Sequence, residues 1–222
     1  MTKLGIITGI AMEAKLLERF VSPSLMVDYA GLDPSAAHRA AEKMIAAGAT
    51  ALLSFGLAGG LNPAVGAGAV VIPAEIRGQR KLSCDLAWTK RLASLMKETP
   101  SLLAHAPHVL STAAMKAAVF AVTGAPAADM ESYGIAETAA VHGLPFAALR
   151  VVADTAADTV PSIALKSVDN AGRLRVGKAA WGALTHPWQI PELVRLGGRT
   201  ATAMSKLEAL ARLGAGGLFG LM

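Results

Sequence analysis

The stretch AADMESYGIAETAAVHGLPFAALRVVAD, residues 127–154, predicts a short strand, a helix and a second strand in that order. The helix is alanine-rich and ends at a His-Gly pair, which is a common helix stop. The same alternation of short apolar runs and longer helical runs recurs along the chain and favours an α/β fold. Strands are expected at 4–10, 24–29, 51–55, 69–73, 108–111, 127–129 and 145–152, and helices at 13–20, 34–47, 85–97, 113–122 and 132–141.

The chain is expected to form a single domain over residues 1–222, because no linker or internal repeat divides it. No further strand is expected beyond residue 154. The C-terminal segment 176–222 is expected to be mostly helical, with helix breaks at Pro187, Pro191 and Gly197-Gly198 and a glycine-rich apolar tail.

Composition narrows the class of protein further. Hydrophobic residues make up 53% of the chain and charged residues 17%, which excludes long disorder. Cys84 is the single cysteine, so an internal disulfide and a multi-cysteine zinc site are excluded and a reducing cytoplasm is expected. The formal charge of +5 suits an anionic partner, but the basic residues are dispersed and aromatic residues are few, so nucleic acid is not an expected partner.

Carboxylates stand at the ends of the two strands that frame the opening stretch. Asp129 and Glu131 follow the first strand, and Arg150 and Asp154 lie on and after the second. Open α/β sheets bind ligands at such carboxyl ends, and a carboxylate there is costly unless it is paired or functional. These carboxylates could instead be helix caps with one salt bridge to Arg150, and for a single aspartate after a strand that interpretation would be favoured. Two such segments together with a glycine-rich strand end favour a functional site.

Two other strand ends suit a ligand. The run 56–60, Gly-Leu-Ala-Gly-Gly, lets a ligand approach the backbone closely, although its spacing matches neither a phosphate loop nor a dinucleotide fingerprint. The turn after the first strand places Gly9 before a helix N-terminus with Lys15 in its first turns, which suits an anion. Taken alone, an ordinary turn with a solvated lysine is the favoured interpretation of this second feature. No histidine spacing indicates a metal site.

Together these segments resemble the nucleoside phosphorylase and nucleosidase superfamily over roughly residues 3–158. The matching motifs, in order, are Gly5-Ile6-Ile7-Thr8-Gly9 with Met12-Glu13, Gly56-Leu57-Ala58-Gly59-Gly60-Leu61, Asp129-Met130-Glu131-Ser132 and Arg150-Val151-Val152-Ala153-Asp154. The resemblance implies a three-layer phosphorylase/hydrolase-like fold with a central mixed β-sheet flanked by helices.

Within that superfamily the chain most resembles the hopanoid-associated phosphorylases, over nearly its whole length. The features are 54–63 (SFGLAGGLNP), 129–132 (DMES), 144–150 (LPFAALR) and 191–197 (PELVRLG). This resemblance implies release of adenine from adenosylhopane, a step of hopanoid lipid biosynthesis.

The resemblance also implies residue roles. Glu131 would bind the ribose hydroxyls, Met130 would pack against the sugar, and Asp154 would protonate purine N7 as the glycosidic bond breaks, with Arg150 in support. Acid catalysis of this kind typically contributes about 10²–10⁴-fold in rate. The residues assigned to the base pocket are Ala58, Gly59, Met115 and Asp129.

The nucleophile is left open by two departures from the superfamily pattern. Relatives that hydrolyse adenosine-type substrates place a water-activating glutamate near the end of the first motif, and by register that position is Lys15. A lysine is a poor base at neutral pH, since its reference pKa is about 10.4, and it suits phosphate instead. Gly9, Lys15 and Gly56 are therefore assigned to a phosphate or nucleophile site, with phosphate as the expected co-substrate. Leu57 and Ala153 replace hydroxyl residues of relatives, which weakens the case for phosphate and removes a partner of Asp154.

Two other functions stay open. One is a hydrolytic nucleosidase for methylthioadenosine or adenosylhomocysteine-type nucleosides, and the other is a nucleoside-binding protein without activity. A lipid-linked nucleoside would require peripheral contact with the inner membrane face, for which Trp181, Trp188, Phe219 and Met222 are candidates, although packing is the slightly favoured interpretation for the helices. A cytoplasmic homodimer or larger homo-oligomer is expected by analogy with relatives.

Overall fold

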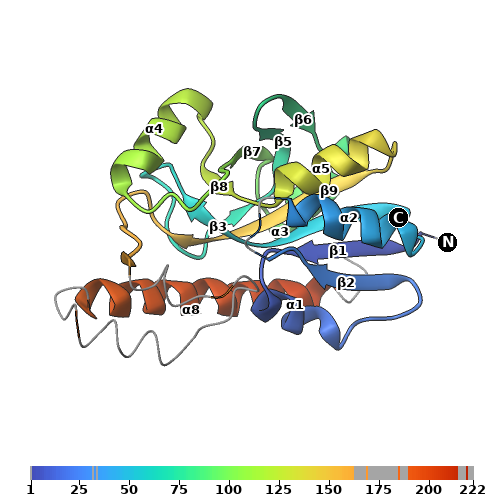
Figure 1. Ribbon diagram of the computed structural model, residues 1–222, viewed down its shortest axis with the longest axis horizontal. Coiled ribbons are helices and arrows are strands. Elements are labelled where there is room, and N and C mark those ends of the chain that lie inside the picture. Colours follow the sequence, from blue (N-terminus) through green and yellow to red (C-terminus); the bar gives the residue numbers. More distant parts are fainter. Residues whose placement is uncertain are drawn as a thin grey trace.

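A mixed β-sheet of nine strands forms the centre of the molecule, with helices on both faces (Figure 1). The computed structural model describes residues 2–31, 33, 35–162, 169, 185, 190–214 and 219. The predicted three-layer α/β fold with a mixed central sheet is confirmed in this part of the chain. The strands are β1 (Leu4–Thr8), β2 (Leu25–Tyr29), β3 (Ala51–Gly60), β4 (Val70–Val71), β5 (Pro73–Arg77), β6 (Lys81–Ser83), β7 (Ser101–His105), β8 (Ala127–Asp129) and β9 (Phe146–Asp154).

The long strand β3 organises the sheet, which runs in the order β2-β1-β3-β8-β7-β5-β6. The first part of β3 pairs in parallel with β9, from Leu52 opposite Phe146 to Ala58 opposite Val152. Its last residues pair antiparallel with β8, where Gly59 lies opposite Ala128. The ends of β8 and β9 therefore meet at the end of β3, which brings the two predicted carboxylate segments to the same glycine-rich strand end.

Apolar side chains attach helices to both faces of the sheet. Helices α1 (Ala11–Glu18), α3 (Leu86–Met96) and α8 (Ile190–Leu213) pack on one face through a cluster that includes Trp88, Leu149 and Leu207. Helices α2 (Ala36–Ala46) and α5 (Ser132–Val141) cover the other face, and α4 (Ala113–Thr123) packs near the ends of β7 and β8. Figure 1 shows α1 and α8 below the sheet and α2 and α5 above it.

Two expectations about secondary structure are wrong. The strand expected at 108–111 lies earlier, as β7, and residues 108–111 are not in a strand. Pro107, which has no N–H group to donate, follows the end of β7. The breaks expected at Pro191 and Gly197-Gly198 are absent, since α8 is continuous there, and the break expected at Pro187 lies outside the described residues. Pro191 is tolerated because it stands in the first turn, where its missing N–H has no helical partner.

The C-terminal residues are described only in part. Phe219 is fully buried and meets Phe55 edge to face, with ring centroids 5.4 Å apart, so its side chain packs in the core instead of facing a membrane. Trp181, Trp188 and Met222 lie outside the described residues. Within the described part of the chain, none of the helices combines the length and the hydropathy needed to span a bilayer.

Candidate active site

A cavity of about 280 Å³ opens where β3, β8 and β9 end. The predicted site residues that line it are Gly9, Ala58, Gly59, Asp129, Met130, Glu131 and Asp154. Leu57 and Ala153, the two departures from the superfamily pattern, line it as well. Four of the predicted site residues do not line the cavity: Gly56, Arg150, Lys15 and Met115.

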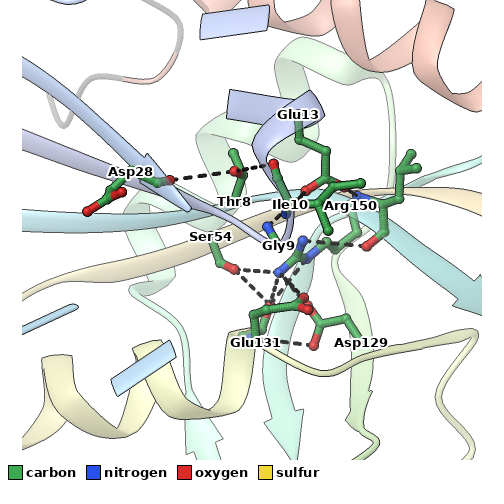
Figure 2. Close-up of polar contacts among 11 residues, drawn as sticks. Thr8, Gly9, Ile10, Glu13, Asp28, Ser54, Asp129, Glu131 and Arg150 are labelled. Atoms are coloured by element: carbon green, nitrogen blue, oxygen red, sulfur yellow. Dashed lines mark hydrogen bonds and ion pairs between the residues drawn. The ribbon is translucent and has the colours of Figure 1, made fainter. Parts of the chain in front are cut away.

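Arg150 lies behind the cavity wall and ties its carboxylates together (Figure 2). Its guanidinium is fully buried and lies 2.5 Å from Asp129 Oδ2 and 3.4 Å from Glu131 Oε2. Arg150 Nη2 also donates to Ser54 Oγ at 2.6 Å and to Ser132 Oγ at 3.1 Å. Each of its three guanidinium nitrogens donates to a protein acceptor, and Arg150 does not line the cavity.

Glu13 occupies the anion-ready turn that precedes α1. Its carboxylate is buried and accepts backbone N–H groups from Gly9 at 2.8 Å, Ile10 at 3.0 Å and Leu57 at 2.8 Å. The side chain also lines the cavity, next to Glu131. A carboxylate fixed by three N–H donors is a rigid hydrogen-bond acceptor that faces the ligand space.

The placement of Lys15 at the nucleophile site is corrected by this geometry. Lys15 is exposed and lies away from the cavity. Two positions along an α-helix correspond to a rotation of about 200°, so Glu13 and Lys15 point to opposite sides of α1. The side chain of this helix that lines the cavity is therefore Glu13, two residues before Lys15.

Gly56 is required for packing behind the site and does not line the ligand space. A Cβ atom at this position would stand 2.5 Å from Arg150 Nη1 and 2.8 Å from Glu13 Oε2. Only glycine allows the guanidinium and the carboxylate to approach β3 this closely.

Burial and charge crowding control the ionisation of these acids. The pKa of Glu131 is raised from 4.5 to about 8 by burial, with Asp129 and Glu13 adding to the rise and Arg150 opposing it. The pKa of Glu13 is also raised by burial, against the effect of Arg150 and the three backbone donors. Both carboxyl groups therefore bind protons more readily than they would in water.

Asp154 has a partner that the sequence analysis missed. Lys116 of α4 is 1% exposed, and its ammonium group forms an ion pair with Asp154 Oδ2 and donates to the carbonyl oxygen of Thr155 at 2.7 Å. Burial raises the pKa of Asp154, and Lys116 opposes that rise. The signal in the sequence is that Lys116 is the single charged residue of an otherwise apolar helix.

Met115 does not form part of the cavity wall, and its assignment to the base pocket is corrected. Its sulfur atom is within 3.8 Å of Ser111 Oγ outside the pocket, while its neighbour Lys116 points inward. Adjacent helix residues point about 100° apart, so only one of the two can face the cavity. The described residues contain no group of three histidine, cysteine, aspartate or glutamate side chains suited to hold a metal ion.

This combination of fold and site is that of a known class of enzyme. Residues 29–181 match the phosphorylase superfamily, and the chain belongs to it. The predicted superfamily and enzyme class are confirmed at that level. No curated protein matches the chain significantly by sequence.

Solved structures of nucleosidases are similar to this chain. A 5′-methylthioadenosine/S-adenosylhomocysteine nucleosidase from Colwellia psychrerythraea, in complex with adenine, matches with a TM-score of 0.70 and 15% identity over 96% of this chain and 95% of that one. A mutant Helicobacter pylori nucleosidase with 5′-methylthioadenosine in its active site matches with a TM-score of 0.67 and 14% identity over 96% and 99%. The futalosine hydrolase of Helicobacter pylori strain 26695 matches with a TM-score of 0.63 and 16% identity over 69% and 88%. At these identities the likeness establishes the shared fold.

Proposed function

We propose that this enzyme hydrolyses the N-glycosidic bond of a purine nucleoside, with Glu13 as the base that activates water and Asp154 as the acid that protonates the leaving purine. The observation that carries the proposal is the Glu13 carboxylate, buried and held by three backbone N–H groups at the wall of the cavity. Similar folds with adenine or 5′-methylthioadenosine bound support a purine nucleoside as the substrate class.

The order of side chains along the cavity suits this substrate. The Glu131 carboxyl group lies about 3 Å from the Cβ position of Gly9, beside Glu13, and Asp154 lies over Gly59. A ribose whose hydroxyl groups are held by Glu131 and whose ring packs on Met130 would place C1′ between Glu13 and Asp154. Water then loses a proton to Glu13 as its oxygen bonds C1′, the C1′–N9 electron pair goes to the purine, and N7 takes a proton from Asp154.

Phosphate as the co-substrate is the competing proposal, and the geometry favours it less. The N–H groups of Gly9, Ile10 and Leu57, which would suit an anion, are already bound by Glu13. Glu131 adds a second carboxyl group beside them. Phosphate would have to displace the Glu13 carboxylate from these three donors.

Assays with and without phosphate test the proposal. The candidate substrates are 5′-methylthioadenosine, adenosine, S-adenosylhomocysteine, futalosine and adenosylhopane. For each substrate that is cleaved, the rate of base release should be the same in phosphate-free and phosphate-containing buffer. Glu13→Gln should lower turnover by at least about 10²-fold, because an amide cannot take a proton from water. Glu18→Gln, on the exposed part of the same helix, is the matched control and should retain activity. Release that requires phosphate would favour phosphorolysis, and nucleoside binding without release would favour a binding protein.

A lipid-linked adenosine such as adenosylhopane is a second candidate substrate. The observation that favours it is the apolar part of the cavity wall, made by Val109, Leu110, Val160 and Leu196. Together with the resemblance to hopanoid-associated phosphorylases, this wall suits an apolar 5′ substituent. A kcat/KM for adenosylhopane that exceeds the value for methylthioadenosine by tenfold or more would support it, and the reverse order would support the small nucleoside.

A further inference from the structure

Lys116 is a charged group in the cavity wall that the proposed chemistry has not used. Its side chain crosses from α4 to the end of β9 with its ammonium group buried. Two acceptors are bound, Asp154 Oδ2 and the Thr155 carbonyl oxygen. Burying an ammonium group is costly unless it is paired, so this position is adapted to the carboxylate that it meets.

The two oxygens of Asp154 have different surroundings. Oδ2 accepts from Lys116, whereas Oδ1 lies 3.2 Å from the Cβ position of Gly59, a residue of the cavity wall. The residue before Asp154 is Ala153, which has no hydroxyl group with which to orient the carboxyl group. The ammonium group of Lys116 is therefore the side-chain donor found on Asp154 among the described residues.

We infer that Lys116 is the positioning residue of the acid, donating to Oδ2 so that the transferable proton of Asp154 is carried on Oδ1, toward the leaving base. This inference rests on the proposed function of Asp154. A carboxylic acid carries one proton on one of its two oxygens. The oxygen that accepts a hydrogen bond from the ammonium group is unfavourable for this proton, because an N–H group already points at it. The proton is thereby directed to the oxygen over Gly59. When N7 takes it, the carboxylate that forms is already paired with a cation.

The charge of Lys116 also adjusts the strength of the acid. The other charged groups near Asp154 are Asp158, which follows β9 and pairs with Arg199 of α8, and the acids Glu13, Asp129 and Glu131, which surround Arg150. His108 lines the same cavity. Asp158 favours a protonated Asp154, whereas the ammonium group of Lys116 favours the ionised form. Removing it should keep Asp154 protonated to a higher pH.

The experiment compares Lys116→Met and Lys116→Arg with the wild-type enzyme, using the pH profile of kcat/KM for whichever nucleoside is cleaved. Lys116→Met should lower kcat at the pH optimum by about tenfold or more, with KM changed by less than about threefold. Its alkaline limb, which reports the ionisation of Asp154, should move upward by about one pH unit or more. Lys116→Arg should restore both values toward wild type.

Thr112→Ala provides the matched control for a purely structural effect. Thr112 is exposed and caps α4 by accepting the Met115 N–H at 3.2 Å, away from the cavity. This variant should lower the Tm and leave the alkaline limb in place. If Lys116→Met does not fold, Lys116→Gln takes its place, with the same expected movement of the limb.

An alkaline limb that stays in place in Lys116→Met or Lys116→Gln would overturn the inference. A parallel measurement keeps it separate from the proposed function. Calorimetric titration with free adenine measures binding that needs a protonated Asp154, and its alkaline loss should move to higher pH in the same variants. A wild-type enzyme that binds adenine with this pH dependence and cleaves no nucleoside would contradict the proposed function. The shift of adenine binding in the Lys116 variants would then still support or overturn the effect of Lys116 on Asp154.

Discussion

Two carboxyl groups of one cavity meet different partners at the residue scale. Glu13 is held by backbone N–H groups, which fix it without carrying a full charge, while Asp154 faces the ammonium group of Lys116. These environments suit the two tasks of the proposed reaction, proton acceptance from water by Glu13 and proton donation to the purine by Asp154. Such a division between two carboxyl groups is a common solution to acid–base catalysis.

Asp154→Asn should lower kcat by about 10²–10⁴-fold, because an amide cannot donate the acid proton in its place. The fold should be retained, as the amide oxygen can still accept from Lys116. Asp28→Asn is the matched control, since Asp28 lies outside the cavity and pairs with Lys43. Steady-state kinetics with thermal melting checks both, and wild-type turnover in Asp154→Asn would refute the acid role.

The pH profile of the wild-type enzyme should be bell-shaped. Glu13 acts only as a carboxylate, so activity should rise with pH through its pKa, which burial raises above the ordinary value. Asp154 acts only when protonated, so activity should fall as it ionises, and burial raises its pKa too. A profile of kcat/KM measures both limbs, and a rate that is flat from pH 5 to 9 would contradict this assignment.

The sequence predicted Asp129, Glu131 and Asp154 as site residues because each follows an apolar strand, a local signal. It did not reveal Lys116, because the pairing of α4 with the end of β9 joins residues 38 positions apart. The register of the first motif also misled the prediction, since side-chain direction on α1 separates Glu13 from Lys15 and spacing alone does not show which of them points inward.

The end of β3 carries the site at the scale of elements. Its first half pairs with β9 and its last residues with β8, so one strand aligns both carboxylate segments. Alternating strands and helices made this α/β arrangement predictable. The location of β7 was not, because its short run is no more apolar than residues 108–110, which instead line the cavity.

Gly56→Ala should destabilise the protein by roughly 2–4 kcal/mol, because the added methyl group would clash with Arg150 and Glu13, whose charged atoms cannot separate without losing buried partners. Gly66→Ala is the matched control, as a Cβ atom there meets nothing within 4 Å. Urea unfolding at neutral pH measures the two free energies of unfolding. Equal stability of the two variants would show that Gly56 is not constrained.

The distribution of charge matters at the scale of the whole molecule. The chain carries a formal net charge of +5, yet the centre of the site places Glu13, Asp129 and Glu131 around the single guanidinium of Arg150. Three carboxyl groups around one guanidinium repel one another when they are ionised. In the proposed reaction they would accept hydrogen bonds from sugar hydroxyl groups and stabilise the positive charge of the sugar in the transition state. The homo-oligomer expected from the sequence remains a prediction, which light scattering in solution would test.

Glu131→Gln should therefore stabilise the folded protein at alkaline pH while it abolishes turnover. The folded pKa of Glu131 is about 8, against 4.5 ordinarily, so between these values the folded protein holds a proton that the unfolded chain has lost. The contribution of Glu131 to the free energy of unfolding of the wild type therefore falls as pH rises from about 4.5 to 8. The variant lacks this fall, and its advantage should grow to on the order of 1–3 kcal/mol. Thermal melts at pH 5 and pH 8.5 check this, with Glu18→Gln as control, and equal Tm differences at both values would refute it.

The most direct test of water as the nucleophile is to follow oxygen from solvent. The enzyme is incubated with the best purine nucleoside substrate in phosphate-free buffer made with H₂¹⁸O, and the sugar product is analysed by mass spectrometry after short reaction times. Hydrolysis through Glu13 predicts one ¹⁸O atom at C1′ of the free sugar and an unchanged rate when phosphate is added. A reaction that stops without phosphate, or that yields the sugar 1-phosphate when phosphate is present, would contradict it.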